Sequence, residues 1–296
     1  MITKMLRRRT ARMTGVIAVL ALSTGVFSAP ASADPAPPIF IGLGDSYAAG
    51  MGGGLYLTDP PGLPFNCNQT AAGYSRHLPA TPSNPANMHL GCAGFTTENV
   101  TAVVTGLAAN PATQPVLQNA SVITVTVGGN DIGAAGATAQ CAALRATPDC
   151  RKALFDSIAV KLPQLPAKIK AMVSAIKSKA PLARIVLTGY PRLFTINSSM
   201  TTEQKSMATT VNAAADLLNA TIAVSAVASR VGYVSVTNKF LNHGVGSAQP
   251  WIVGLQPLCQ LSSTCAPDTQ PGDTFHPTAT GHISGYAESV KAALIR

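Results

Sequence analysis

Hydrophobic residues in this chain form short uninterrupted runs that alternate with longer amphipathic stretches. The runs are rich in β-branched and aliphatic side chains and occupy residues 39–43, 122–127, 184–187 and 231–236. Runs without polar alternation are typical of strands covered on both faces, as in parallel sheets, although segments this short could also be buried helices. We therefore predict four strands of a mostly parallel sheet.

The amphipathic stretches predict helices between and after these strands. Residues 158–179 place apolar side chains at helical spacing with lysines opposite, and two prolines interrupt the beginning. Thr201 and Gln204 have the spacing of a capping box, which predicts a helix from there to about Arg230. Residues 278–295 predict a last helix. Strands that alternate with helices predict an α/β domain of three layers, α/β/α.

The first 33 residues are predicted not to belong to that domain. Five Lys and Arg without an acidic residue precede an apolar run over residues 16–29 and the small-x-small triplet Ala31-Ser32-Ala33. This is the layout of a secretory signal peptide, whereas an uncleaved anchor would need about 20 apolar residues. We predict cleavage after Ala33, export by the Sec or twin-arginine route, one domain over residues 34–296, and no later membrane span.

Removing that segment changes the charge balance. The 296 residues include 21 Lys and Arg against 12 Asp and Glu, but residues 34–296 retain only 16 of the basic residues, for a net charge of +4. With 47% hydrophobic and 11% charged residues, the chain is not intrinsically disordered. It has no Lys/Arg stripe with interleaved aromatics, so we predict no nucleic-acid partner; weak attraction to an anionic surface stays open.

All six cysteines lie after residue 33, and an even number in an exported chain favours disulfides. No Cys-x-x-Cys spacing indicates zinc, so we expect neither a metal nor a cofactor. The Gly- and Pro-rich stretches 50–66 and 243–272 are predicted to be long surface loops held by disulfides. Among fifteen pairings, neighbours in sequence suggest Cys67–Cys92, Cys141–Cys150 and Cys259–Cys265.

Residues that could act as a nucleophile, a base or a hydrogen-bond donor follow the ends of the predicted strands or precede the last helix. Gly44-Asp45-Ser46 follows the first strand, Gly128-Gly129-Asn130-Asp131 follows the second, and Asp273 and His276 precede the last helix. Ligands of open parallel sheets bind beyond the carboxyl ends of the strands. A serine, a histidine and a carboxylate are the parts of an activated nucleophile. Asp273 could accept a hydrogen bond from Nδ1 of His276, which leaves Nε2 to take the proton of Ser46.

Each of these motifs alone is common in turns and helix caps, so only their joint occurrence indicates a site. Asn130 and Asp131, for example, could simply cap a helix. No Gly-x-Ser-x-Gly surrounds Ser46, which excludes the usual nucleophile elbow of α/β-hydrolases. The other histidines lack an acidic residue three positions earlier and are predicted to have surface or packing roles: His77, His89, His243 and His282.

Together the motifs resemble the conserved blocks of the SGNH (GDSL) hydrolases, most closely the secreted actinobacterial lipases and esterases, a branch with three disulfides. The resemblance covers residues 42–282 and implies a flavodoxin-like fold and a serine ester hydrolase. It implies that Ser46 is the nucleophile, that His276 is the general base and that Asp273 orients it. The implied oxyanion donors are the backbone N–H groups of Ser46 and Gly94 and the side-chain amide of Asn130.

Gly91 or Ala93 would replace Gly94 as the oxyanion donor if the second block were shifted. The chain also departs from this branch in two places. Tyr47-Ala48-Ala49-Gly50 has alanines where the branch often has serines, which should matter little for the chemistry. Cys259 and Cys265 are closer together than the third disulfide of the branch, which leaves open the shape of the late loop and of one wall of the substrate groove.

The sequence does not determine the substrate. Apolar side chains near the strand ends, such as Leu193, Trp251 and Phe275, would suit fatty-acyl or other lipid esters. A carbohydrate acetylesterase would need aromatic platforms, and the chain has one Trp. A catalytically silent module that binds lipid or the cell envelope would not need these motifs. We therefore predict a secreted, monomeric hydrolase of small-molecule or lipid esters, with peripheral contact to lipid or the envelope.

Overall fold

Five parallel strands form one sheet in the order β2-β1-β3-β4-β5. A computed structural model describes residues 37–60, 63, 66–78, 84–255 and 272–295. The four predicted strands appear as β1 (Phe40–Gly44), β3 (Val122–Thr126), β4 (Arg184–Thr188) and β5 (Gly232–Val234). The edge strand β2 (Met88–Gly91) was not predicted, because its four residues contain a histidine and a glycine and no apolar run.

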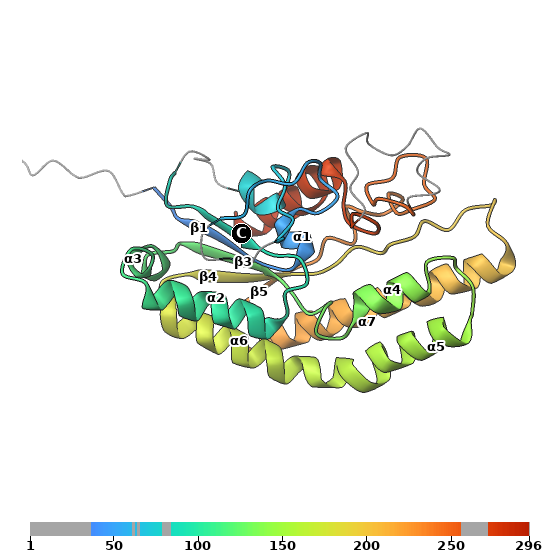
Figure 1. Cartoon of the computed structure of the whole chain (residues 1–296), viewed down its shortest axis with the longest axis horizontal. Helices are drawn as coiled ribbons and strands as arrows, with labels where there is room; N and C mark the ends of the chain where they lie inside the picture. The colour runs from blue at the N-terminus through green and yellow to red at the C-terminus, as the bar shows by residue number, and fades with distance from the viewer. Residues whose placement is uncertain (1–36, 61–62, 64–65, 79–83, 256–271, 296) are drawn as a thin grey trace, which may run out of the picture. The chain divides into compact units, whose positions relative to one another are not determined.

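This strand order is that of flavodoxin-like, doubly wound sheets. Helices cover both faces, which confirms the predicted three-layer α/β/α class. Figure 1 shows α2 (Thr97–Ala109), α6 (Leu165–Lys179) and α7 (Thr202–Ala228) together on one face. The C-terminal helices η4 (Gly281–Ala287) and α9 (Glu288–Leu294) lie on the other.

Side chains of the strands alternate between two apolar cores. On β4, Ile185 and Leu187 pack into the core that contains Ile169 of α6, whereas Val186 packs into the core that contains Tyr286 of η4. Because neighbouring residues point to opposite faces of a sheet, a strand buried on both faces consists mainly of apolar residues and threonines, such as Thr126, whose hydroxyl is hydrogen-bonded. This is why the strands appeared in the sequence as uninterrupted runs.

The helix starts differ in how well the sequence predicted them. The capping box at the start of α7 is confirmed, since Gln204 N–H donates to Thr201 Oγ1 and Thr201 N–H donates to Gln204 Oε1. The helix predicted from residue 158 begins as α6 only at Leu165. Before it lie a π-helix, η2 (Asp156–Lys161), and a 3₁₀ turn, η3 (Leu162–Gln164), which includes Pro163.

Several helices had no clear signal in the sequence. α4 (Ala134–Gln140) has the sequence AAGATAQ, which shows no apolar periodicity, and α5 (Pro148–Phe155) has only eight residues. Two others are shorter still: α1 (Ser46–Ala49) and α3 (Gln114–Gln118). Such helices depend on packing rather than on their own propensity, so only the folded structure shows them.

By length and composition, α7 is apolar enough to cross a membrane, which the sequence analysis did not anticipate. Its hydropathy comes from many alanines rather than from a continuous run of large apolar residues. Val211 and Ile222 are buried in the two cores, and Asp216 forms an ion pair with Arg192. In the described domain, α7 therefore packs one side against the two cores, while Leu217, Val224 and Val227 are exposed.

Two disulfides join neighbouring segments near the site. Cys67 pairs with Cys92, and Cys141 pairs with Cys150. Cys259 and Cys265 lie outside the described residues, as do the predicted signal peptide and the cleavage site after Ala33. The described compact unit begins at Pro37.

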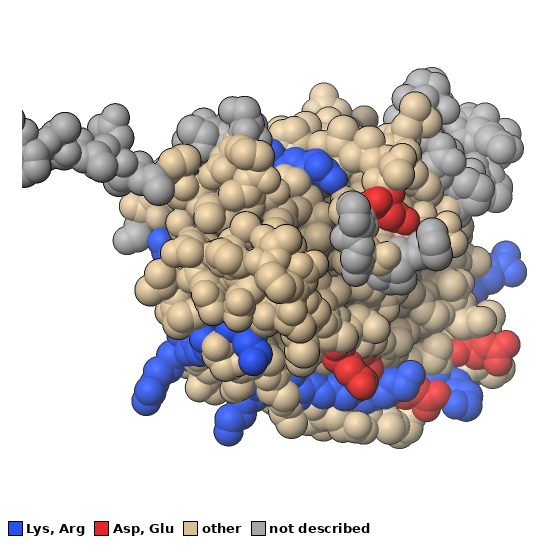
Figure 2. All heavy atoms as spheres, turned by 60° about the vertical axis from the view of Figure 1, so that its left-hand side comes forward, with Lys and Arg blue, Asp and Glu red and all other residues tan. Residues whose placement is uncertain are grey.

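Charged side chains are sparse on the face shown in Figure 2, where Lys and Arg stand mainly along one edge among Asp and Glu. Four Lys or Arg residues of the described chain form ion pairs with acidic residues: Lys152–Asp156, Lys168–Asp131, Arg192–Asp216 and Lys291–Glu288. Lys and Arg of the described chain are therefore partly balanced by acidic partners rather than gathered into one positive field.

Candidate active site

The carboxyl ends of β1 and β3, which are adjacent in the sheet, carry the central residues of the candidate site. Ser46 begins α1 directly after β1, and Asn130 lies in the turn after β3. Gly44 ends β1 with φ +131°, and a Cβ there would lie 2.0 Å from the carbonyl oxygen of Thr126. The glycine therefore lets the chain turn tightly against β3 and present Ser46 at the topological switch point, where doubly wound sheets bind ligands.

Ser46 meets His276 across 230 residues of sequence. Nε2 of His276 lies 2.7 Å from Oγ of Ser46, a hydrogen-bond distance. With Nε2 unprotonated, the serine hydroxyl donates to it, which is the arrangement in which a base removes the proton of a nucleophile. The structure thus brings together the two residues on which the sequence-based prediction of hydrolysis depends.

A tight turn holds His276 in this place. Phe275 has φ +64°, which is rare for a residue with a side chain, and His276 N–H donates to the carbonyl of Asp273. Val253 fixes the turn from the other side, since Phe275 N–H donates to its carbonyl and its own N–H donates to the His276 carbonyl. The Tyr47 hydroxyl donates to the Phe275 carbonyl at 2.6 Å, which ties the residue after Ser46 to the residue before His276.

Burial lowers the pKa of His276 below its ordinary value of 6.5. The negative charge of Asp273 raises it in part, as do the backbone carbonyls of Gly272, Asp273 and Thr274. Because the net shift is downward, the imidazole is neutral at pH 7. A neutral imidazole is the form that can accept the serine proton.

Asp273 is fully buried, but the structure shows different hydrogen bonds for it from the one we expected. Its Oδ1 accepts from Gly52 N–H at 2.9 Å and from the Tyr56 hydroxyl at 2.8 Å. Nδ1 of His276 has no hydrogen-bond partner in the described part of the chain. The Asp273 carboxylate therefore acts on the imidazole through its charge, while its hydrogen bonds hold the loop after α1.

Asn130 is held beside the segment that contains Gly94. Its Nδ2 donates one hydrogen to the Phe95 carbonyl at 3.0 Å, which leaves the second amide hydrogen for another acceptor. The next residue, Asp131, accepts from the backbone N–H and the hydroxyl of Thr97. The turn after β3 and the loop after β2 are thus locked together.

Gly94 lies in that loop with φ +80° and is exposed to solvent. The alternatives fit the role of oxyanion donor less well. Ala93 N–H is used by the Cys67 carbonyl, and Gly91 is packed in β2, where a Cβ would lie 2.4 Å from the backbone of Ala48. Gly94 is not, however, among the residues that line the pocket at Ser46.

A buried network joins the ends of three strands. The Tyr190 hydroxyl, which follows β4, donates to Oδ2 of Asp45 and accepts from Gly129 N–H at 3.0 Å. Oδ1 of Asp45 accepts from Tyr47 N–H at 3.0 Å. Burial raises the pKa of Asp45 to about 7, although the hydrogen bonds from Tyr190 and Tyr47 act in the opposite direction. Tyr190 thus fixes the backbone next to Asn130 relative to the backbone next to Ser46.

A pocket of about 450 Å³ opens at these residues, within the size range of small-molecule sites. Ser46, Asn130 and His276 lie on its wall, with Leu193 and Phe275 among the apolar side chains. Other apolar residues named in the sequence analysis lie elsewhere, such as Trp251, which stacks on His243 at 3.9 Å. We call the 450 Å³ pocket at Ser46 the catalytic pocket.

The remaining histidines have the packing and surface roles that the sequence predicted. His282 is buried, its Nε2 lies 2.9 Å from the Met51 carbonyl, and burial lowers its pKa to about 4. His89 pairs with Ser75, and burial lowers its pKa to about 4 as well. His77 contacts a backbone carbonyl at the surface.

Sequence reasoning missed several residues that organise the site. Tyr190, Tyr56 and Gly52 take part through hydrogen bonds to Asp45 or Asp273. The sequence predicts Tyr190, which follows a strand end, as a wall residue of an acyl cleft, but it gives no sign of the bond from Tyr190 to Asp45. Tyr56 and Gly52 lie in a long loop, where no periodicity points to a partner 217 or 221 residues away.

Comparisons with known proteins show which family this chain resembles. The model of the GDSL-like lipase/acylhydrolase family matches residues 43–282. "Lipase 1" of Streptomyces coelicolor is 27% identical over 96% of this chain and 99% of its own length, and a lipase of Streptomyces rimosus is 29% identical over 97% and 99%.

Solved structures of Streptomyces lipases also resemble this chain. The extracellular lipase of Streptomyces rimosus superimposes with a TM-score of 0.68 at 27% identity, over 86% of this chain and 99% of that one. Phospholipase A1 of Streptomyces albidoflavus also has a TM-score of 0.68 at 27% identity, over 87% and 99%. The similarity therefore includes the fold as well as the motifs.

Proposed function

Because this chain belongs to the GDSL-like lipase/acylhydrolase family and is a carboxylic ester hydrolase, we propose that it cleaves lipid esters with Ser46 as nucleophile and His276 as general base. Asp273 supports the base, and Ser46, Gly94 and Asn130 supply the oxyanion donors. The observation that carries the proposal is the 2.7 Å contact between Ser46 Oγ and His276 Nε2.

The first half of the reaction forms an acyl-enzyme. Oγ of Ser46 attacks the ester carbonyl carbon while Nε2 of His276 takes the hydroxyl proton. The negative charge that develops on the carbonyl oxygen is stabilised by the backbone N–H groups of Ser46 and Gly94 and by the free amide hydrogen of Asn130. When the tetrahedral intermediate collapses, the C–O bond breaks and His276 returns the proton to the leaving alcohol.

In the second half of the reaction, water hydrolyses the acyl-enzyme. His276 removes a proton from a water molecule, whose oxygen attacks the acyl-enzyme carbonyl. The same donors stabilise the second tetrahedral intermediate, and the Ser46 oxygen leaves with the proton from His276. The charge of Asp273 and the carbonyls around the imidazole favour the imidazolium that forms in both halves.

Two observations support lipid esters as the substrate class. The catalytic pocket has apolar side chains on its wall beside the reacting groups, among them Leu193 and Phe275. The relatives carry the names lipase and phospholipase A1. An apolar wall suits an acyl chain, because burial of each methylene favours binding.

We also propose that the protein is secreted. The basic start, the apolar run and Ala31-Ser32-Ala33 support a signal peptide. Cys67–Cys92 and Cys141–Cys150 are disulfides, which persist in oxidising compartments. A similar structure is that of an extracellular lipase.

Active-site labelling with a fluorophosphonate tests the proposed function. We expect the wild-type protein to be labelled at Ser46, as located by peptide mass spectrometry, and to hydrolyse p-nitrophenyl esters. S46A should lose both the label and the hydrolysis. Ser178→Ala, which removes an exposed hydroxyl on α6, away from both pockets, is the matched control and should keep the label. Labelling at another serine, or full ester hydrolysis by S46A, would refute the role of Ser46. A preference for acetyl esters would favour a carbohydrate acetylesterase instead.

A further inference from the structure

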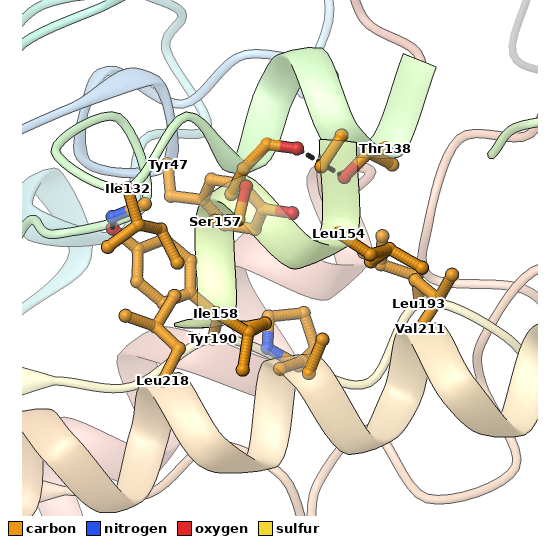
Figure 3. Close-up of a pocket in the computed structure, with 16 residues that line it drawn as sticks. Tyr47, Ile132, Thr138, Leu154, Ser157, Ile158, Tyr190, Leu193, Val211 and Leu218 are labelled. Carbon is orange, nitrogen blue, oxygen red and sulfur yellow. Dashed lines mark hydrogen bonds between the residues drawn. The ribbon is translucent and has the colours of Figure 1, made fainter. Parts of the chain in front are cut away.

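A second cavity lies next to the catalytic pocket, and the chemistry above does not use it. This inner cavity measures about 90 Å³ and lies between α4, α5 and η2 on one side and α7 on the other (Figure 3). It shares part of its wall with the catalytic pocket: Tyr47, Gly129, Ala134, Thr138 and Leu193 line both. The inner cavity is therefore adjacent to the place where the ester would react.

The wall of the inner cavity offers little for a polar ligand. Three of its hydroxyl groups are already engaged with other atoms of the protein: Thr138 donates to the Ala134 carbonyl at 2.7 Å, Tyr47 donates to the Phe275 carbonyl, and Tyr190 donates to Asp45. Most of the other lining side chains are apolar, including Ile132, Leu154, Ile158, Val211 and Leu218 (Figure 3).

The size and chemistry of the inner cavity together indicate its occupant. It is smaller than the sites that hold a whole small molecule, but it shares a wall with the catalytic pocket, which falls within their range. Apolar cavities of similar size stay dry and bind hydrocarbon groups. The end of a ligand whose reacting group lies at Ser46 therefore fits this space if that end is hydrocarbon.

The π-helical geometry of η2 adds an independent observation. Ser157 and Ile158, which line the inner cavity, both belong to this segment. π-Helical turns are rare and often accompany functional sites. Across the cavity, α7 presents Ala214 and Ala215, whose small side chains leave the space open.

We propose that the inner cavity between α4, α5, η2 and α7 is an acyl-chain subsite, which takes the end of an unbranched acyl chain whose ester carbonyl lies at Ser46. The proposal rests on the proposed ester hydrolysis and adds a specificity role to residues outside the catalytic set. Ala214 determines how deep the chain can enter, because a larger side chain there fills the cavity. Each methylene moved from water into the cavity favours binding about fourfold.

The test compares A214L with A213L on a p-nitrophenyl ester series from acetate to decanoate. Ala213 is the neighbouring residue on α7 and is exposed, so A213L controls for the same substitution in the same helix. For octanoate and decanoate, we expect A214L to lower kcat/KM at least about tenfold. Acetate hydrolysis should stay within about twofold, and A213L should match the wild type at every length. An unchanged chain-length profile in A214L, or an equal loss at every length, overturns the proposal.

A binding measurement separates this proposal from the proposed function. We expect decanoate, but not acetate, to raise the unfolding temperature of the wild type and A213L, and A214L to lose most of that shift. No shift in the wild type overturns the acyl-chain subsite even if Ser46 is labelled. No hydrolysis of any ester, with the decanoate shift present, refutes the proposed function while the inner cavity is still shown to bind an acyl chain. Stabilisation of A214L with an unchanged chain-length profile would mean that the space is only a packing void.

Discussion

Asn130 has two amide hydrogens, and the structure uses one of them to hold the side chain in place. That hydrogen goes to the Phe95 carbonyl, so the amide is fixed before any substrate binds. A donor that is already oriented stabilises charge in the transition state without having to reorganise. The value of Asn130 thus depends on its support by the loop after β2.

We expect N130A to lower kcat about 10²–10³-fold and to leave KM within about twofold. The physical reason is that one oxyanion donor contributes mainly in the transition state. Steady-state kinetics on a p-nitrophenyl ester, with circular dichroism to confirm folding, measure this. If KM rose and kcat stayed constant, Asn130 would be a substrate-binding residue instead.

The pH profile tests the role of the Asp273 charge. Burial lowers the pKa of His276 and the Asp273 charge partly raises it, so D273N should lower that pKa further. Activity needs the neutral imidazole, which forms above this pKa, so the acidic limb of kcat/KM should move to lower pH.

The same D273N variant should also lower kcat, but less than H276A does, because H276A removes the base itself whereas D273N keeps the imidazole 2.7 Å from Ser46. D216N, which removes a surface carboxylate paired with Arg192, is the matched control and should leave the profile unchanged. A limb that stays in place or moves to higher pH in D273N would contradict this account.

At the scale of elements, the helices around the inner cavity are short and need outside support. α4 and α5 have seven and eight residues, and the disulfide between Cys141 and Cys150 joins the end of one to the beginning of the other. Isolated helices of this length are not stable in water. The disulfide and the packing against α7 therefore hold the wall of the proposed acyl-chain subsite.

Removal of this disulfide should have a measurable cost. We expect C141S/C150S to lower the free energy of unfolding by about 2–3 kcal/mol, the range for a closed loop of about ten residues. Urea denaturation without reductant measures the loss. The comparison is C67S/C92S, whose 25-residue separation should give a larger loss of about 3–4 kcal/mol. An equal or reversed order would show that native packing, rather than the entropy of the unfolded chain, determines the effect.

At the scale of the whole described domain, the strand order assembles the site. β1 and β3 lie side by side, so Ser46 and Asn130 emerge at one edge although 84 residues separate them in number. His276 arrives from the other end of the chain, just before the last helices, and the bond from Tyr47 to the Phe275 carbonyl fastens this segment. The two cores on either side of the sheet keep these strand ends fixed relative to one another.

Short sequence patterns explain which elements and which site residues could be predicted. The four buried strands, the start of α7 and the identities of Ser46 and His276 follow from short patterns, because burial on both faces, a capping box and a block motif are each written within a few residues. β2, α4 and α5 could not be predicted, since their sequences carry weak signals and tertiary packing stabilises them. The sequence also did not reveal that α7 is long and apolar enough to pass a test for membrane spans, since its apolar character is spread over many alanines.

The sequence by itself determined the α/β class, the family motifs and which residue types could form a nucleophile and a base, because these depend on neighbours in the chain. Only the tertiary structure decided that Ser46 faces His276, that Asp273 bonds to Gly52 and Tyr56 rather than to the imidazole, and that an apolar cavity adjoins the catalytic pocket. The physical reason is that hydrogen bonds and cavities between distant segments depend on how whole elements pack, and no local pattern records that packing.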